Sequence, residues 1–169
     1  MEGLGRLFDL SCGVAPVDLQ TAQTGKRVSL RHAAGVSIVL FKGAGTAADD
    51  PTVTLKEHTA SSGGTSQNLA VIDHYHLKAE TALDGDETWE TVTQSAAATI
   101  ADPGGDGTSA ESQQIVVIEV DATSLSDGYA YVSLDVADVG GNAQLGAVLY
   151  ILRDLASQRA PDKMHAPLS

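Results

Sequence analysis

The sequence has 169 residues, of which 43% are hydrophobic and 4% aromatic, and its formal net charge is −12. A chain of this length can bury one core without disulfides, and here that core must consist mainly of Val, Ile, Leu and Ala. The negative charge argues against sequence-independent binding to nucleic-acid phosphates, and the few aromatic residues disfavour stacking on bases or sugars.

Single features exclude further classes. Cys12 is the only cysteine, which rules out an intrachain disulfide or a thiolate metal cluster, and we expect a buried, unreactive thiol. The first twelve residues do not resemble a signal peptide. No stretch reaches the ~18–20 apolar residues of a membrane span, so we expect no membrane partner.

The charge is unevenly distributed along the chain. Between residues 43 and 152 there are two basic and 17 acidic residues, a balance of −15. The two ends together have eight basic and five acidic residues, a balance of +3. We therefore expect the middle of the chain to repel anions and the ends to be able to contact an acidic partner.

The first part of the chain, residues 1–24, has weak periodicity and several glycines. It predicts an irregular arm or a short strand with loops. One helical turn containing Leu4, Leu7, Phe8 and Leu10 is a weaker alternative.

The rest of the chain is a series of segments with the alternation or β-branched content of strands. They are residues 27–31, 36–41, 52–58, 68–78, 88–93, 114–120, 129–136 and 145–152. The run 36–41 is apolar at nearly every position, which indicates a strand covered on both faces. The run 145–152 also fits helical spacing, but a preceding Gly-Gly-Asn turn favours a strand.

Polar, glycine-rich stretches separate these segments. Residues 43–51 predict a connection with an acidic tip, and residues 96–112 predict a mobile surface loop. From residue 160 the tail carries two prolines and is expected to be disordered unless a partner holds it. The sequence thus predicts an all-β protein, an antiparallel β-sandwich or barrel of about seven or eight strands. Its expected parts are an arm (1–24), the domain (25–156) and a flexible tail (157–169).

The sequence gives only weak indications of a metal site. His74 and His76 lie two apart in a strand and could share a metal ion if His58 or a carboxylate supplied a third ligand. Half-exposed strand histidines are the favoured interpretation, and no metal or cofactor is predicted. The acidic turns at residues 49–50 and 84–87 suggest calcium, but neither fits a twelve-residue calcium loop.

No catalytic motif is present. The Gly-x-Ser-x-Gly elbow is missing, and although a triad assembled in space stays open, we expect no enzyme. Trp89 could line a sugar platform, but a lone Trp in a strand is expected in the core.

Two stretches of the chain carry a family resemblance. Residues 24–31 and 36–41, followed by Gly43-Ala44-Gly45-Thr46 and residues 49–55, resemble small virion structural proteins of tailed bacteriophages. Residues 131–136 through 149–152 resemble the same group. These proteins are called minor capsid or head decoration proteins.

The resemblance implies an all-β, non-enzymatic protein on the outer capsid surface of a virion. It would form a homo-oligomer, a trimer being favoured, and would clamp neighbouring subunits of the major capsid protein. The hypothesis is that residues before Gly35 and the tail from Arg153 make the contact. The cations proposed for it are Arg6, Lys26, Arg27, Arg31, Arg153 and Arg159. The alternatives are a tail or connector protein, and a carbohydrate-binding β-sandwich for host attachment.

Overall fold

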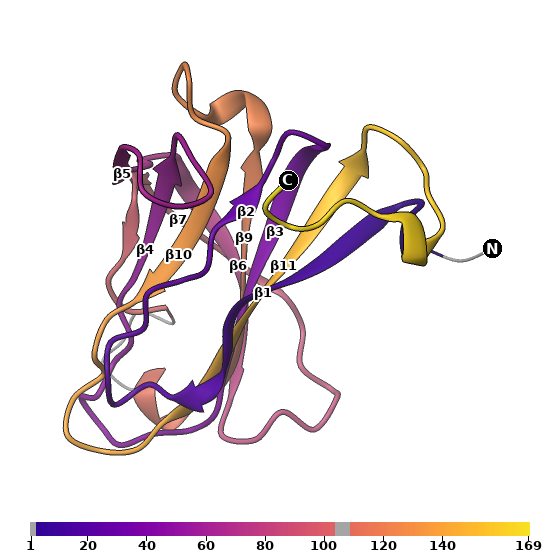
Figure 1. The fold of residues 1–169 in the computed structure, drawn as a ribbon. Coiled ribbons are helices and arrows are strands. Elements are labelled where there is room, and N and C mark those ends of the chain that lie inside the picture. The colour runs from indigo at the N-terminus through magenta and orange to yellow at the C-terminus, as the bar shows by residue number, and fades with distance from the viewer. Residues whose placement is uncertain (1–2, 104–108) are drawn as a thin grey trace.

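The computed structural model describes residues 3–103 and 109–169. Within these residues eleven strands form two antiparallel sheets that pack face to face, so the predicted all-β sandwich is confirmed (Figure 1). No helix in this part of the chain has the length and apolar character needed to span a bilayer.

The larger sheet has six strands in the order β1-β11-β3-β9-β6-β7. Their bounds are Phe8–Asp18 (β1), Ala33–Lys42 (β3), Ile72–Glu80 (β6), Glu90–Ala97 (β7), Gln113–Asp121 (β9) and Leu145–Leu155 (β11). The ambiguous last run is therefore a strand.

The smaller sheet has the order β2-β10-β4-β5, with β8 also paired to β4. Its strands are Val28–Ser29 (β2), Val53–His58 (β4), Ser66–Asn68 (β5), Thr99–Ile100 (β8) and Tyr131–Val136 (β10). Short 3-10 turns lie at Ser109–Glu111 (η1), Ala122–Ser124 (η2) and Pro161–Lys163 (η3).

The core lies between the sheets and is built from alternate strand positions. Val36, Ile38 and Leu40 of β3 are buried, and so are Leu55 of β4 and Leu134 of β10. Because side chains of one strand alternate between its faces, the residues between these positions point away from the core.

The N-terminal segment differs from its expected form. Residues 8–18 are an eleven-residue strand at the edge of the larger sheet, paired along its length with β11. Gly13 suggested a break in regular structure, but a Cβ atom there would lie 2.7 Å from Cζ of Tyr150. Glycine is needed at that position for close packing, and β1 is part of the sandwich.

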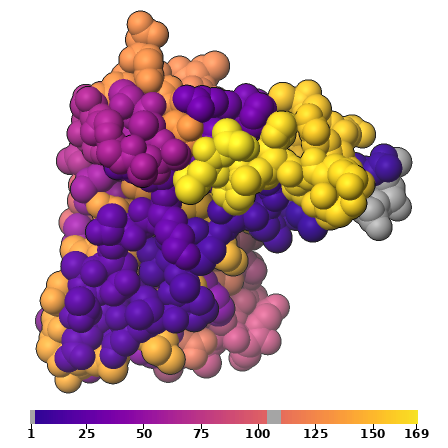
Figure 2. Space-filling view, in the orientation of Figure 1, coloured from indigo at the N-terminus to yellow at the C-terminus, as the bar shows by residue number. Residues whose placement is uncertain are grey.

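The tail is also placed against the body of the protein. The backbone N–H of Arg159 donates to the carbonyl oxygen of Gly5 at 2.7 Å, and the N–H of Ser29 donates to that of Pro167 at 2.8 Å. Residues 3–9 and 156–169 form a terminal lobe at one end of the sandwich, and the last residues of the tail lie over the body of the protein (Figure 2). Contacts within the chain thus hold a segment that was expected to need a partner.

The long loop predicted over residues 96–112 is partly ordered. Residues 104–108 lie outside the described residues. On one side of them β8 pairs with β4, and on the other Ala110 is buried and its N–H donates to Oδ1 of Asp50 at 2.9 Å. These contacts explain why the described parts of the loop are not free surface chain.

Candidate interaction surface

The cations expected to bind a partner divide into two groups. Arg27 donates from Nη1 to the carbonyl oxygens of Ala60 (2.6 Å) and Gly63 (2.7 Å), and from Nη2 to Oγ of Ser66 (3.2 Å). Its guanidinium therefore supports the loop between β4 and β5.

Arg31 and Arg153 also contact side chains of the same chain. Arg31 lies over the ring of Tyr131, 4.9 Å from its centroid, and donates to its hydroxyl at 2.7 Å. Arg153 pairs with Glu119 at 3.0 Å and Asp121 at 2.5 Å, and also reaches Asp154. These carboxylates surround its charge and raise the pKa of Arg153 above its usual range, against the opposing effect of burial.

The remaining three cations are exposed, and the structure does not bring all six into one patch. Arg6 and Arg159 belong to the terminal lobe. Lys26 lies beside Arg27 in a depression of about 770 Å³ that Leu10 and Leu168 also line. The terminal lobe and this depression are therefore the places where the predicted cations face solvent.

The histidines do not assemble a metal site. The rings of His74 and His76 meet edge to face with centroids 5.6 Å apart, and each Nδ1 bonds a neighbouring side chain, Asp73 or Thr91. His58 is buried in the smaller sheet, whereas His74 and His76 belong to the larger one. Among the described residues the one cluster with metal-ligand spacing is Asp84, Asp86 and Glu87. It is an acidic turn, in which the backbone N–H of Gly85 lowers the pKa of Glu87.

A serine and a histidine do meet at hydrogen-bonding distance. Nε2 of His58 lies 2.9 Å from Oγ of Ser133, and its Nδ1 lies 2.7 Å from Oγ of Ser66. Ser133 is 1% exposed, however, so its hydroxyl is out of reach of a substrate in this conformation. Burial, together with Arg27, lowers the pKa of His58. The cluster joins β4 to β5 and β10.

The most distinctive surface is the outward side of the larger sheet. Three rows of opposed residues cross β11, β3 and β9, and two of these rows also reach β1; the rows are almost free of charge. The first row is Cys12, Leu149, Val39 and Val117; the second is Ala147, Phe41 and Ile115; the third is Leu10, Ile151, Ser37 and Glu119. Opposed residues lie on one side of a sheet, so these side chains form a continuous surface.

We call these residues, with Leu145 and Trp89, the outer apolar face. Its large side chains are open to solvent: Phe41 is 52% exposed, Leu149 47%, Leu145 67% and Trp89 53%. Trp89 was expected in the core, so that prediction is wrong. Cys12 is half-buried and lies in the first row, not in the core.

Two hollows lie in the outer apolar face. One, of about 350 Å³, is lined by Pro16, Phe41, Leu145 and Ala147. The other, of about 410 Å³, is lined by His76, Trp89, Thr91 and Val117. Lys78 Nζ lies 5.1 Å from the ring centroid of Trp89 and so places a cation at the rim. Exposed aromatic anchors beside hollows and a charged rim are typical of protein interfaces.

The extent of this face can be estimated from strand geometry. Four strands at about 4.8 Å spacing and three rows at about 7 Å spacing cover roughly 400 Å² in projection. The largest apolar patch on a typical monomer is about 300–600 Å² and is often functional. The sequence contained a signal for it, because runs 36–41 and 114–120 are apolar on both sides.

No family model, curated protein or solved structure matches this chain. The function is therefore inferred from the surface and its chemistry.

Proposed function

We propose that this protein is a non-enzymatic structural component that docks on another protein through its outer apolar face. The observation that carries the proposal is that the outward side of β3 has the apolar composition of a buried strand but is open to solvent. Residues 36–41 have the composition of a strand buried on both sides, whereas Phe41 is 52% exposed. A second molecule that covers this side would remove the apolar side chains from water.

The energetics favour such a cover. If all of the roughly 400 Å² were apolar and became buried, it would contribute at most about 10 kcal/mol at ~25 cal/mol per Å², before the cost of association. A stable interface buries about 800 Å² on each partner. The outer apolar face would therefore supply the centre, and its rim, with Lys78 and the ion-paired Arg153, would supply the remainder.

In its specific form, the proposal is a decoration protein on the outer capsid surface of a tailed phage, bridging subunits of the major capsid protein and contacting neighbouring copies of itself. The family resemblance supports this assignment. The acidic middle of the chain suits a surface that faces solvent, and Arg6, Lys26 and Arg159 remain exposed for a partner.

The test is binding to purified, undecorated phage heads. Leu149→Lys and Phe41→Ser change solvent-exposed positions and should leave the fold intact. Each should weaken binding at least tenfold, because anchor residues at interfaces contribute about 2 kcal/mol or more. Asn68→Lys, which adds a similar charge on the exposed strand β5, is the matched control. Undiminished binding of both face variants would exclude docking through this side of the sheet.

The arm hypothesis needs a milder test than deletion of residues 1–24, since that deletion removes β1 from the larger sheet. Arg6→Ser and Arg159→Ser leave the strands intact. If the terminal lobe contacts the capsid through charge, the double variant should bind heads more weakly at low salt and equally at high salt. Cross-linking to the major capsid protein, as opposed to tail proteins, distinguishes decoration from a tail or connector role.

One observation favours a second candidate, carbohydrate binding in host attachment. Trp89 is exposed beside a hollow, as a sugar platform requires. Titration of Trp fluorescence with a panel of host-surface glycans tests it, with Trp89→Ala as the control. Quenching that disappears in Trp89→Ala would support this candidate, and an unchanged spectrum would count against it.

A further inference from the structure

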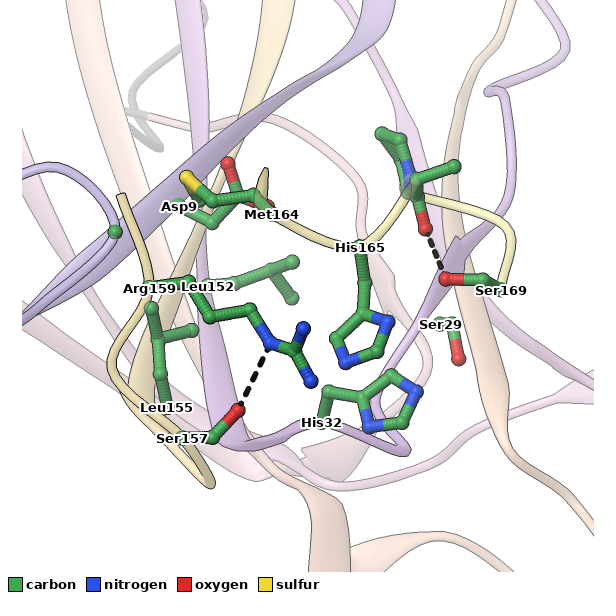
Figure 3. A pocket seen from close by; sticks show the side chains of 13 residues that line it. Asp9, Ser29, His32, Leu152, Leu155, Ser157, Arg159, Met164, His165 and Ser169 are labelled. Carbon is green, nitrogen blue, oxygen red and sulfur yellow. Dashed lines mark hydrogen bonds between the residues drawn. The ribbon is translucent and has the colours of Figure 1, made fainter. Parts of the chain in front are cut away.

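Two histidines and an arginine converge where the tail meets the sandwich. His32 precedes β3, and His165 and Arg159 belong to the tail. The two imidazole rings are stacked, with centroids 3.8 Å apart and planes 10° from parallel. Figure 3 shows the Arg159 guanidinium directed toward both rings across a crevice that is also lined by Ser29, Ser157 and Ser169. The tail and the start of β3, which are far apart in sequence, thus both contribute nitrogen donors to one cluster.

The donors of this cluster are largely unused within the described residues. Arg159 makes one side-chain hydrogen bond there, from Nε to Oγ of Ser157 at 3.3 Å, and no ion pair. Neither imidazole makes a hydrogen bond in the same part of the chain. Asp9 also lines the crevice, but Oδ1 of Asp9 accepts from the N–H of Leu10 at 2.7 Å. In Figure 3 Asp9 lies beside Met164, away from the rings.

The electrostatics of the crevice favour the binding of a negative charge. Desolvation lowers the pKa of His165, and the neighbouring His32 and Arg159 lower it further. Three groups that are or can become cationic stand together in a protein whose net charge is −12. An oxyanion between them would accept hydrogen bonds from the guanidinium and from both rings, and such charge-assisted bonds are the stronger kind.

We propose that His32, Arg159 and His165 form a binding site for a small oxyanion of the phosphate or carboxylate class. The volume of the crevice is about 30 Å³, which is enough to admit an atom the size of a water oxygen. One anionic oxygen atom enters the crevice, and the rest of the ligand stays in solvent. The site is independent of the outer apolar face and of any partner bound there.

A bound oxyanion stabilises the contact between the tail and the body of the protein. His165 and Arg159 come from the tail, and His32 comes from the body, so one ligand bridges the two. Without the anion, protonation of His165 places an imidazolium beside the guanidinium of Arg159. Because the folded-state pKa of His165 is lowered, the tail contact is complete above the ordinary histidine pKa and weakens as pH falls through about 6.5. Bound oxyanion reverses this weakening.

The test uses the full chain at pH 6 with sodium phosphate, sodium acetate or sodium chloride at matched ionic strength. Histidine ¹⁵N and ¹H NMR, followed over a pH titration in each salt, reports the pKa of His165. Hydrogen exchange of the Ser29 amide at pH 6 reports the tail, since that N–H donates to Pro167. Phosphate should raise the pKa of His165 and slow exchange at Ser29 at least threefold. The acetate arm shows whether a carboxylate is an equivalent ligand.

The variants make the site falsifiable. Arg159→Gln, His32→Gln and His165→Gln should each raise the phosphate concentration needed for the effect on Ser29 at least tenfold. Lys163→Gln, which removes another tail cation that pairs with Asp162, should keep it. The proposal is overturned if chloride matches both phosphate and acetate, or if Lys163→Gln behaves like Arg159→Gln. Unchanged core resonances of Tyr150 in each variant show that the sandwich remains folded.

Discussion

The hydroxyl of Tyr150 accepts a hydrogen bond from the backbone N–H of Leu134 at 3.1 Å. Tyr150 belongs to the larger sheet and Leu134 to the smaller, so one buried side chain joins the two layers. The same hydroxyl donates to the carbonyl oxygen of Lys26 at 2.8 Å, which fixes the connection that leads to β2.

Tyr150→Phe should destabilise the protein by about 1–3 kcal/mol, because it leaves a buried N–H and a carbonyl without their partner. Urea unfolding followed by circular dichroism measures the loss. Tyr129→Phe is the control, since the Tyr129 hydroxyl makes no hydrogen bond in the described part of the chain. An equal loss in both variants would contradict a special role for the Tyr150 hydroxyl.

Arg27→Ala should loosen the loop between β4 and β5, because its guanidinium holds the carbonyl oxygens of Ala60 and Gly63. We expect a loss of about 1 kcal/mol in global stability, given the partial exposure of these bonds. The sharper readout is faster hydrogen exchange at Thr59 and Thr65, which bond across the loop. Lys26→Ala, at the neighbouring exposed position, should leave exchange there unchanged.

The stability of the smaller sheet should fall in mild acid because of His58. Burial and the cations around it lower its pKa, so the unfolded chain binds a proton at a higher pH than the folded protein. Stability is therefore complete above the ordinary histidine pKa and decreases as pH falls through about 6.5. Thermal unfolding at pH 7.5 and 5.5 should show a smaller decrease in Tm for His58→Gln than for wild type. His74→Gln, at an exposed position, should retain the wild-type decrease.

Above about pH 8, the stability of the protein should depend on the protonation of Lys42. Lys42 is buried at the end of β3, where its Nζ donates to the carbonyl oxygen of Ser112 at 2.7 Å, and burial lowers its pKa to about 8. Between that value and 10.5 the unfolded chain binds more protons, so stability should rise with pH.

Urea midpoints measured from pH 8 to about 9.5 should therefore increase in wild type and stay level in Lys42→Met. The upper limit avoids the ordinary tyrosine range, because burial raises the pKa of Tyr150 and reverses the sign there. Lys56→Met, which removes a half-exposed lysine paired with Asp135, should keep the wild-type slope.

The sequence predicted the central strands well because their signal is local. Runs 36–41 and 114–120 are dense in β-branched and apolar residues, and they became β3 and β9. The pattern failed where tertiary packing decides. Residues 68–78 were expected to form one alternating strand, but Ile72 and Tyr75 of β6 are both buried and Asp73 is exposed. The register with β7 shifts between Ile72 and His74, which changes the side that faces the core.

The interaction surfaces were harder to predict than the strands. The apolar run 36–41 indicates an apolar outward side of β3, but whether another layer of the same chain covers that side is not encoded in the local pattern. His32 and His165 are separated by most of the chain, so their stacking could not be expected from spacing. The cations Arg27, Arg31 and Arg153 were proposed from their place in the basic ends of the chain and from the family resemblance, neither of which indicates that intramolecular partners surround them.

The pairing of β1 with β11 constrains the order of events during synthesis. β1 emerges from the ribosome first, yet its partner in the sheet is the last strand, β11. Until residues 145–155 are available, the first strand cannot take its place, and β3 lacks its neighbour on that side. Such non-local pairing slows folding and leaves a nascent edge open to other chains. Newly made copies at high local concentration should therefore be most prone to misassembly before the last strand is translated.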